Sequence, residues 1–188
     1  MRLLMAAGAI AALMACGSAA QSGEAGQTAS ARGCQAVATQ AWQAGDEALT
    51  IEATSTGPDC ERAVATLAVR NDEGRVWWVD ARAAEHVMTL AGARSVEEMQ
   101  QRLREWIDVT VAGRDSTADL PVWPEGADAP DAGEFPFYVE DGWDRTSYEG
   151  IRAADRAMFC YVQGMESLAC VAAVDGRLDK IGVQSFPG

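Results

Sequence analysis

The feature that most constrains this chain is an uncharged apolar run near its start. Arg2 is followed by thirteen residues without a charge, Leu3 to Ala15. A helix of this length rises about 20 Å, which is short of the roughly 30 Å hydrocarbon core of a membrane. A positive residue before a short apolar run is typical of a secretory signal peptide, and no later stretch approaches the length of a transmembrane helix. The run therefore predicts export of a soluble domain.

The run ends in Leu13-Met14-Ala15-Cys16, which is followed by Gly17. This ending resembles the lipobox of bacterial lipoproteins, where a leucine, a middle residue and a small residue precede an acylated cysteine. The resemblance implies removal of residues 1–15 as the signal peptide and a lipidated Cys16 as the membrane anchor. In that family an aspartate after the cysteine commonly retains the protein in the inner membrane, so Gly17 implies the outer membrane, facing the periplasm. The alternative is cleavage after residues 18–20, which releases a soluble periplasmic protein.

The charge of the chain excludes several classes of function. It carries 15 Lys+Arg against 28 Asp+Glu, a formal net charge of −13. Such an acidic chain cannot neutralise a run of phosphates, so we expect no nucleic-acid partner. His86 is the single histidine, which excludes a multi-histidine metal site, and Lys180 is the single lysine. Phosphate loops, dinucleotide fingerprints and the common hydrolase motifs are absent, so we expect no cofactor.

Four cysteines remain once Cys16 is assigned to the export signal. An even number of cysteines in an exported domain is typical of disulfide bonds, and four cysteines allow three pairings. The spacing favours Cys34–Cys60 and Cys160–Cys170. The second pair flanks a turn at residues 164–167 between two apolar runs, which predicts a hairpin bridged by a disulfide.

The patterning divides the rest of the chain into a tether and a folded domain. Residues 16–33 are small and polar, which is typical of a flexible tether, and residues 34–188 then form a single globular domain. Alternating apolar residues and turn sequences predict two antiparallel meanders. Their expected strands are 49–56, 65–70, 75–82, 158–163, 168–174 and 178–185.

Helical signals lie between the two meanders. Ser95 and Glu98 form a capping-box pattern that opens an amphipathic helix over residues 95–112, followed by Gly113. Residues 83–91 predict a shorter helix before it. Thr146 and Glu149 suggest a second capping box and a short helix toward Ala157. The fold class we expect is α+β, with the 95–112 helix packed on the antiparallel sheet.

The segment 113–144 differs from the rest in composition. It holds nine carboxylates, no basic residue between Asp115 and Asp144, and four of the six prolines. Such a segment repels itself and cannot form a long helix, so we expect an extended acidic loop. Its carboxylates could bind Ca²⁺, but their spacing lacks the pattern of an EF-hand loop. Its charge could also steer a basic protein partner.

Two further features are candidates for function. Trp77 and Trp78 are neighbours on an expected strand, so their indoles should point to opposite faces of the sheet. One would enter the core, and the other would be covered by another element or serve as an exposed anchor for a partner. His86 could act as a general base, although a lone histidine without a motif is more often structural.

These observations lead to a functional expectation without naming a ligand. We expect a lipid-anchored envelope protein that acts as a non-catalytic binding or interaction module, with the membrane as one partner through its anchor. One alternative is an inhibitor of a basic envelope-attacking enzyme such as a lysozyme, because negative charge complements a cationic target. The other alternative is a periplasmic hydrolase that uses carboxylates with His86.

Overall fold

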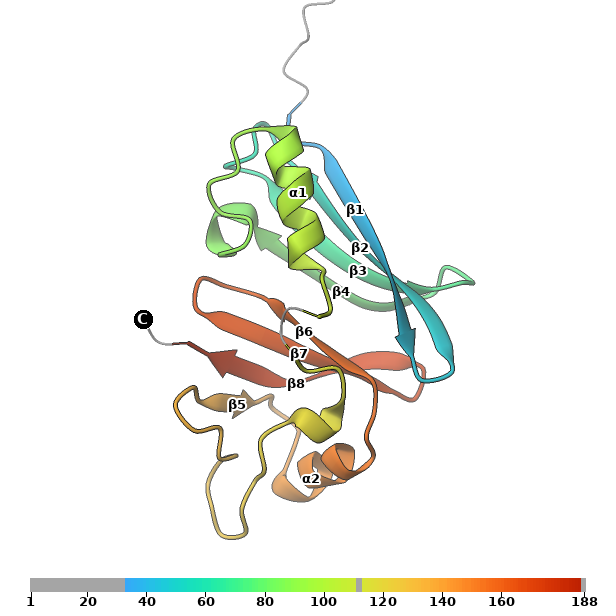
Figure 1. Ribbon diagram of the computed structural model, residues 1–188, viewed down its shortest axis with the longest axis vertical. Helices are drawn as coiled ribbons and strands as arrows, with labels where there is room; N and C mark the ends of the chain where they lie inside the picture. The colour runs from blue at the N-terminus through green and yellow to red at the C-terminus, as the bar shows by residue number, and fades with distance from the viewer. Residues whose placement is uncertain (1–32, 111–112, 187–188) are drawn as a thin grey trace, which may run out of the picture. The chain divides into compact units, whose positions relative to one another are not determined.

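The computed structural model describes residues 33–110 and 113–186, and these fold into two antiparallel four-stranded sheets with two α-helices (Figure 1). The expected α+β class is therefore confirmed. The signal peptide, Cys16 and nearly all of the expected tether lie outside the described residues. Within the described ranges, neither helix has the length and apolar character needed to cross a membrane.

The first sheet is a meander of four strands in sequence order, one more than the sequence predicted. It contains β1 (Ala36–Ala44), β2 (Glu47–Thr56), β3 (Val64–Asn71) and β4 (Val76–Ala83). Side chains alternate along β2, with Leu49, Ile51 and Ala53 buried. The sheet therefore has one core face and one face toward solvent, as alternation predicts. The additional strand, β1, places Trp42 in the core opposite Leu49.

A β-bulge in β4 overturns the expectation for the tryptophan pair. Arg70 pairs with Val76 while Val69 pairs with Trp78, so Trp77 is an extra residue on its strand. A bulge interrupts the alternation of side chains, and two successive residues can then lie on the same side of the sheet. Trp77 is only 5% exposed, and the half-buried Trp78 packs against the same core cluster. The prediction that the indoles point to opposite faces was wrong.

The main helix begins where predicted but ends early. In α1 (Val96–Trp106), the Ser95 hydroxyl caps the helix by accepting the Glu98 N–H at 3.1 Å. The buried side chains of α1 pack on the core face of the first sheet, against β1 and β2. Beyond the helix, the Asp108 carboxylate accepts the Thr110 N–H at 2.9 Å and its hydroxyl at 2.7 Å. This local bonding competes with helical hydrogen bonds, so the predicted continuation of the helix through residues 107–110 was wrong, while residues 111–112 lie outside the described residues.

Other helical predictions are also corrected in detail. Where residues 83–91 suggested a helix, the chain forms a single 3₁₀ turn, η1 (Ala84–His86), followed by further turns. The short helix expected after Thr146 is present as α2 (Arg145–Ala153). Its cap is Asp144, which exchanges hydrogen bonds with Ser147, so the capping box lies two residues before the expected one.

The second sheet is covered on both faces. It contains β5 (Phe137–Val139), β6 (Met158–Val162), β7 (Ser167–Val174) and β8 (Arg177–Ser185), in the order β5-β8-β7-β6. Phe159 and Tyr161 on β6 join the core cluster shared with the first sheet and α1. Met158 and Cys160, on the opposite face, join a second cluster with residues of α2 and of segment 113–144. The second sheet is therefore a middle layer between two cores.

The acidic segment 113–144 is more structured than its composition predicted. It contains a 3₁₀ turn, η2 (Thr117–Asp119), and the edge strand β5. β5 lies so close to β8 that a Cβ on Gly182 would stand 2.5 Å from the Tyr138 carbonyl oxygen. Only glycine allows this approach, and the approach places Phe137 in the second core cluster.

Both disulfides have the expected pairing. Cys34–Cys60 links the chain before β1 to the connection between β2 and β3, and Cys160–Cys170 joins residues directly opposite each other on β6 and β7. All four cysteines are buried.

Candidate functional site

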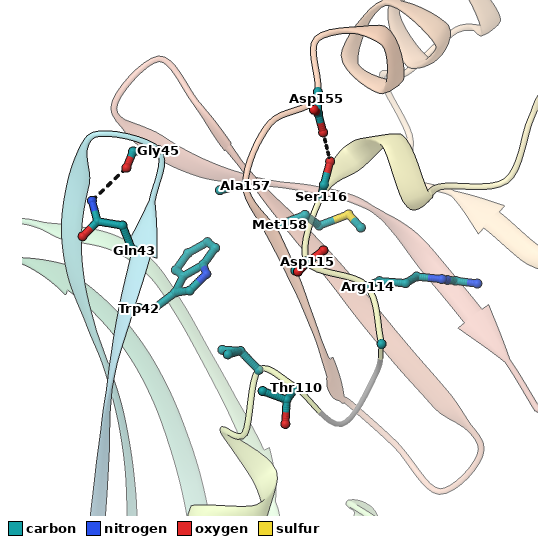
Figure 2. A pocket seen from close by; sticks show the side chains of 12 residues that line it. Trp42, Gln43, Gly45, Thr110, Arg114, Asp115, Ser116, Asp155, Ala157 and Met158 are labelled. Atoms are coloured by element: carbon teal, nitrogen blue, oxygen red, sulfur yellow. Dashed lines mark hydrogen bonds between the residues drawn. The ribbon is translucent and has the colours of Figure 1, made fainter.

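The candidate site is a pocket beside the β1–β2 hairpin, which we call the hairpin pocket (Figure 2). Its volume is about 700 Å³, within the range of small-molecule sites. Three parts of the chain enclose it: the hairpin, residues 109–110 with 113–116, and residues 155–158. Its lining residues are Trp42, Gln43, Gly45, Val109, Thr110, Gly113, Arg114, Asp115, Ser116, Asp155, Ala157 and Met158.

The apolar part of the hairpin pocket belongs to the core and is rigidly held. The Trp42 indole stacks edge-on against Phe159, with ring centroids 5.0 Å apart. Met158 is fully buried, and its backbone N–H donates to the Asp115 carbonyl oxygen at 2.9 Å. Thr117 N–H donates to the Arg156 carbonyl oxygen at 2.8 Å, so two walls of the pocket are joined by backbone hydrogen bonds.

Four polar side chains of the hairpin pocket have protein partners: Gln43, Thr110, Ser116 and Asp155. Gln43 Nε2 donates to the Gly45 carbonyl oxygen at 2.8 Å, and the Thr110 hydroxyl donates to Asp108. The Ser116 hydroxyl donates to the Asp155 carboxylate, as Figure 2 shows. Asp155 has a positive φ of 50°, directly after the C-cap of α2, which is the conformation that commonly ends a helix. These groups are held in place, and each retains acceptor capacity toward the pocket.

Arg114 contributes its stem to the hairpin pocket while its guanidinium extends away from the cavity (Figure 2). Burial lowers the pKa of this guanidinium, and the neighbouring Tyr148 and Asp119 act in the opposite direction. Its Nη1 atom is buried and has no hydrogen-bond partner within the described residues. The pocket therefore gains little positive charge from Arg114, while Asp115 and Asp155 bring negative charge.

The structure does not bring the sequence-based candidates together at this pocket. His86 has a 75% exposed side chain, with its Nε2 3.8 Å from the Glu85 carboxylate, and it does not line the hairpin pocket. Ser116 therefore faces a carboxylate and not a histidine base. Trp77 and Trp78 are not exposed, and Trp78 Nε1 donates to the Tyr161 hydroxyl at 3.2 Å. The covered interpretation of this pair fits the structure better than an exposed anchor.

The acidic side chains do not form an obvious cation site. Across residues 33–110 and 113–186, no three His, Cys, Asp or Glu side chains come together in a way that could hold a metal ion.

A second concavity was not predicted from the sequence. It lies between β5 and residues 123–130 and has a volume of about 310 Å³; we call it the aromatic groove. Its walls include Trp123, Tyr138 and Trp143 together with Asp128, Glu140 and Asp141. The available signal was the presence of five aromatic residues in a segment otherwise rich in acid and proline, three of which are these wall residues. The acid- and proline-rich composition predicted an extended loop, so these aromatic residues were not predicted to form a site.

Comparison of the chain with protein-family models, curated proteins and solved structures finds no match in any of the three.

Proposed function

We propose that this protein is an exported, lipid-anchored envelope protein that works by binding, with the hairpin pocket as its ligand site. The observation that carries the proposal is the pocket's combination of size and lining. Apolar surface from Trp42, Val109 and Ala157 lies beside polar groups whose positions are fixed by hydrogen bonds. Such a lining orients a ligand without requiring the protein to rearrange.

The same lining supports binding over catalysis. A serine nucleophile needs a base within hydrogen-bond reach, and the base in turn needs an orienting partner. Ser116 instead donates to Asp155 and also accepts the Ala118 N–H at 3.0 Å as the cap of η2. Both of its hydrogen bonds are structural. The ligand that fits is a small molecule with an apolar face for Trp42 and donor groups for the carboxylate and amide oxygens.

A fragment screen by NMR tests the ligand site. Fragments that combine an aromatic or aliphatic ring with an amine or hydroxyl should shift the resonances of Trp42, Thr110 and Ala157. Ala157→Leu places a larger side chain at the pocket wall and should weaken the best fragment at least about tenfold. Ala153→Leu, on the exposed side of α2, adds the same volume outside the pocket and should leave the affinity unchanged. Fragment binding that ignores Ala157→Leu, or conversion of bound fragments into products, would contradict the proposal.

Lipidation has a separate test. When the protein is produced in a bacterial host with labelled palmitate, the wild type should incorporate the label and fractionate with the outer membrane. The Cys16→Ser variant should incorporate none. Recovery of an N-terminus that begins at Met1 and carries no lipid would overturn the anchor, while leaving the hairpin-pocket test intact.

A further inference from the structure

The aromatic groove offers an unusual combination of surfaces. The indole N–H of Trp123 donates to the Ala127 carbonyl oxygen at 2.9 Å, and that of Trp143 donates to the Lys180 carbonyl oxygen at 3.1 Å. Both indole donors are therefore used within the protein. What these rings can offer to an occupant of the groove is apolar and π-electron surface, which attracts cations.

Tyr138 completes the aromatic wall from the edge of the second sheet. On β5, Phe137 points into the second core cluster, so the neighbouring Tyr138 points outward and is 62% exposed. β5 is held to β8 by pairing of Tyr138 with Val183 and by the close approach at Gly182. A large aromatic side chain held on a fixed strand and left this exposed is a common anchor in protein interfaces.

The charged side chains lining the groove are all carboxylates. Glu140 pairs with Lys180 at 2.8 Å, whereas Asp128 and Asp141 form no ion pair within the described residues. Carboxylates accept hydrogen bonds and cannot donate them when ionised. An occupant must therefore supply donors and positive charge, together with a surface that packs against aromatic rings.

We propose that the aromatic groove binds the arginine or lysine side chain of a basic protein partner. A guanidinium suits it best, because it is planar, stacks on aromatic rings and donates to carboxylates in pairs. A protein is favoured over a small cation because the negative charge extends well beyond the groove. Segment 115–144 carries nine carboxylates and no basic residue, and the chain has a net charge of −13. This extended field complements a basic surface and speeds its approach.

The proposal is independent of the hairpin pocket and its ligand. The two concavities share no lining residue.

Two synthetic peptides of equal length provide the probe: one alternates arginine with glycine, and the other carries glutamine in place of arginine. The full domain, labelled with ¹⁵N, is titrated with each. The arginine peptide should shift the indole N–H resonances of Trp123 and Trp143 and should bind more weakly as salt rises. The glutamine peptide should leave them unchanged. An arginine peptide that fails to shift these resonances would overturn the proposal.

Matched variants separate the groove from the overall charge. Tyr138→Ala and Asp141→Asn should each weaken the arginine peptide about three- to tenfold, the size of an exposed cation–π contact or charge pair. Val79→Ala removes an exposed side chain from the first sheet, and Asp72→Asn removes one charge from the turn before β4. These controls should change the affinity less than about twofold. An equal loss in Asp72→Asn and Asp141→Asn would show that only net charge matters and would refute the groove.

Two more measurements distinguish the remaining outcomes. Free arginine amide should bind at least about tenfold more weakly than the peptide, because it lacks the neighbouring charges that meet the rest of the acidic segment. Equal affinity would indicate a small-molecule cation site and would count against a protein partner. Ala157→Leu should leave peptide binding unchanged, so a failed ligand site at the hairpin pocket cannot be mistaken for failure of the groove.

Discussion

The two sheets of this protein solve the problem of burial differently. The first sheet buries one face and leaves the other, with exposed Val37, Val64 and Val79, toward solvent. The second sheet buries both faces, one against the first sheet and α1 and the other against α2 and the acidic segment. Alternation of apolar and polar residues therefore marks β2 of the first sheet, whereas nearly continuous apolar runs mark β6 and β7 of the second. The pattern of apolar residues along a strand therefore indicates whether one or both of its faces are buried.

The largest expected effects come from substitutions at neighbouring positions of one strand. On β6 both neighbours should lower the free energy of unfolding, whereas on β2 only one should. Met158 and Phe159 are adjacent on β6 but belong to different core clusters. Replacing either with alanine should lower the free energy of unfolding by about 2–5 kcal/mol, because each leaves a cavity in a packed core. On β2, Ile51→Ala should cost a similar amount, whereas Thr50→Ala, on the solvent face, should change stability by less than about 0.5 kcal/mol. Urea unfolding followed by circular dichroism measures all four.

A small effect of Met158→Ala would show that the second core contributes little, and the comparison between the sheets would fail. A large effect of Thr50→Ala would show that the outer face of the first sheet is covered in solution.

Gly182→Ala should loosen the second sheet, at β5, and leave the first sheet unaffected. The added methyl group would meet the Tyr138 carbonyl oxygen and the Phe137 ring, so β5 must move away from β8. We expect a loss of about 1–3 kcal/mol, typical of overpacking, together with weaker protection of β5 amides against hydrogen exchange. β2 and β3 in the first sheet should keep their protection. Unchanged exchange in β5 would contradict the close packing inferred at this glycine.

The contact between the two sheets depends on a polar network that Tyr161→Phe should weaken. The Tyr161 hydroxyl accepts from Trp78 Nε1 at 3.2 Å and donates to the Asp80 carboxylate at 2.9 Å. Burial raises the pKa of Tyr161, so the phenol stays protonated and remains a donor. Removing the hydroxyl leaves two polar partners unpaired, which should cost about 1–2 kcal/mol. Tyr138→Phe, which alters an exposed tyrosine, is the control and should change the melting temperature little.

The smallest expected effect is a pH dependence of stability that arises from Glu149 on α2. The Trp123 backbone N–H donates to Glu149 at 2.6 Å, and this hydrogen bond, with Arg152 alongside, lowers the pKa of Glu149. A carboxylate with a lowered pKa stabilises the fold above its unfolded pKa and loses that contribution as the pH falls through its folded pKa. Wild type should therefore be more stable than Glu149→Gln at neutral pH, and the difference in melting temperature should shrink as the pH falls below 4.5. A constant difference would contradict this assignment.

The parts of the fold that sequence reasoning found are those with strong local signals. Ser95 and Glu98 fixed the start of α1, and the turn at Asp175-Gly176 fixed the β7–β8 hairpin, where both residues have positive φ. The cysteine spacing indicated both disulfides. In each case a few neighbouring residues determine the structure.

The missed features depend on partners that are distant in the sequence or on a single backbone irregularity. β1 is rich in alanine and carries Gln40 on its core side, so its alternation is faint until β2 pairs with it. The bulge at Trp77 shifts the pairing by one residue, and no pattern in the neighbouring sequence predicts it. The aromatic groove unites Trp123 with Tyr138 and Trp143 only after β5 pairs with β8, a contact between residues 43 to 47 apart in the chain.

The Cys160–Cys170 bridge joins residues that face each other directly across the β6–β7 hairpin. Since successive side chains of a strand lie on opposite faces, a hairpin misaligned by one residue would hold its two thiols on opposite sides of the sheet. Among paired hairpins, the covalent link closes in the native alignment and not in one shifted by a single residue. Oxidation of these thiols would thus act as a proofreading step, and misaligned molecules would keep a pair of reduced sulfurs that distinguishes them chemically from correctly folded ones.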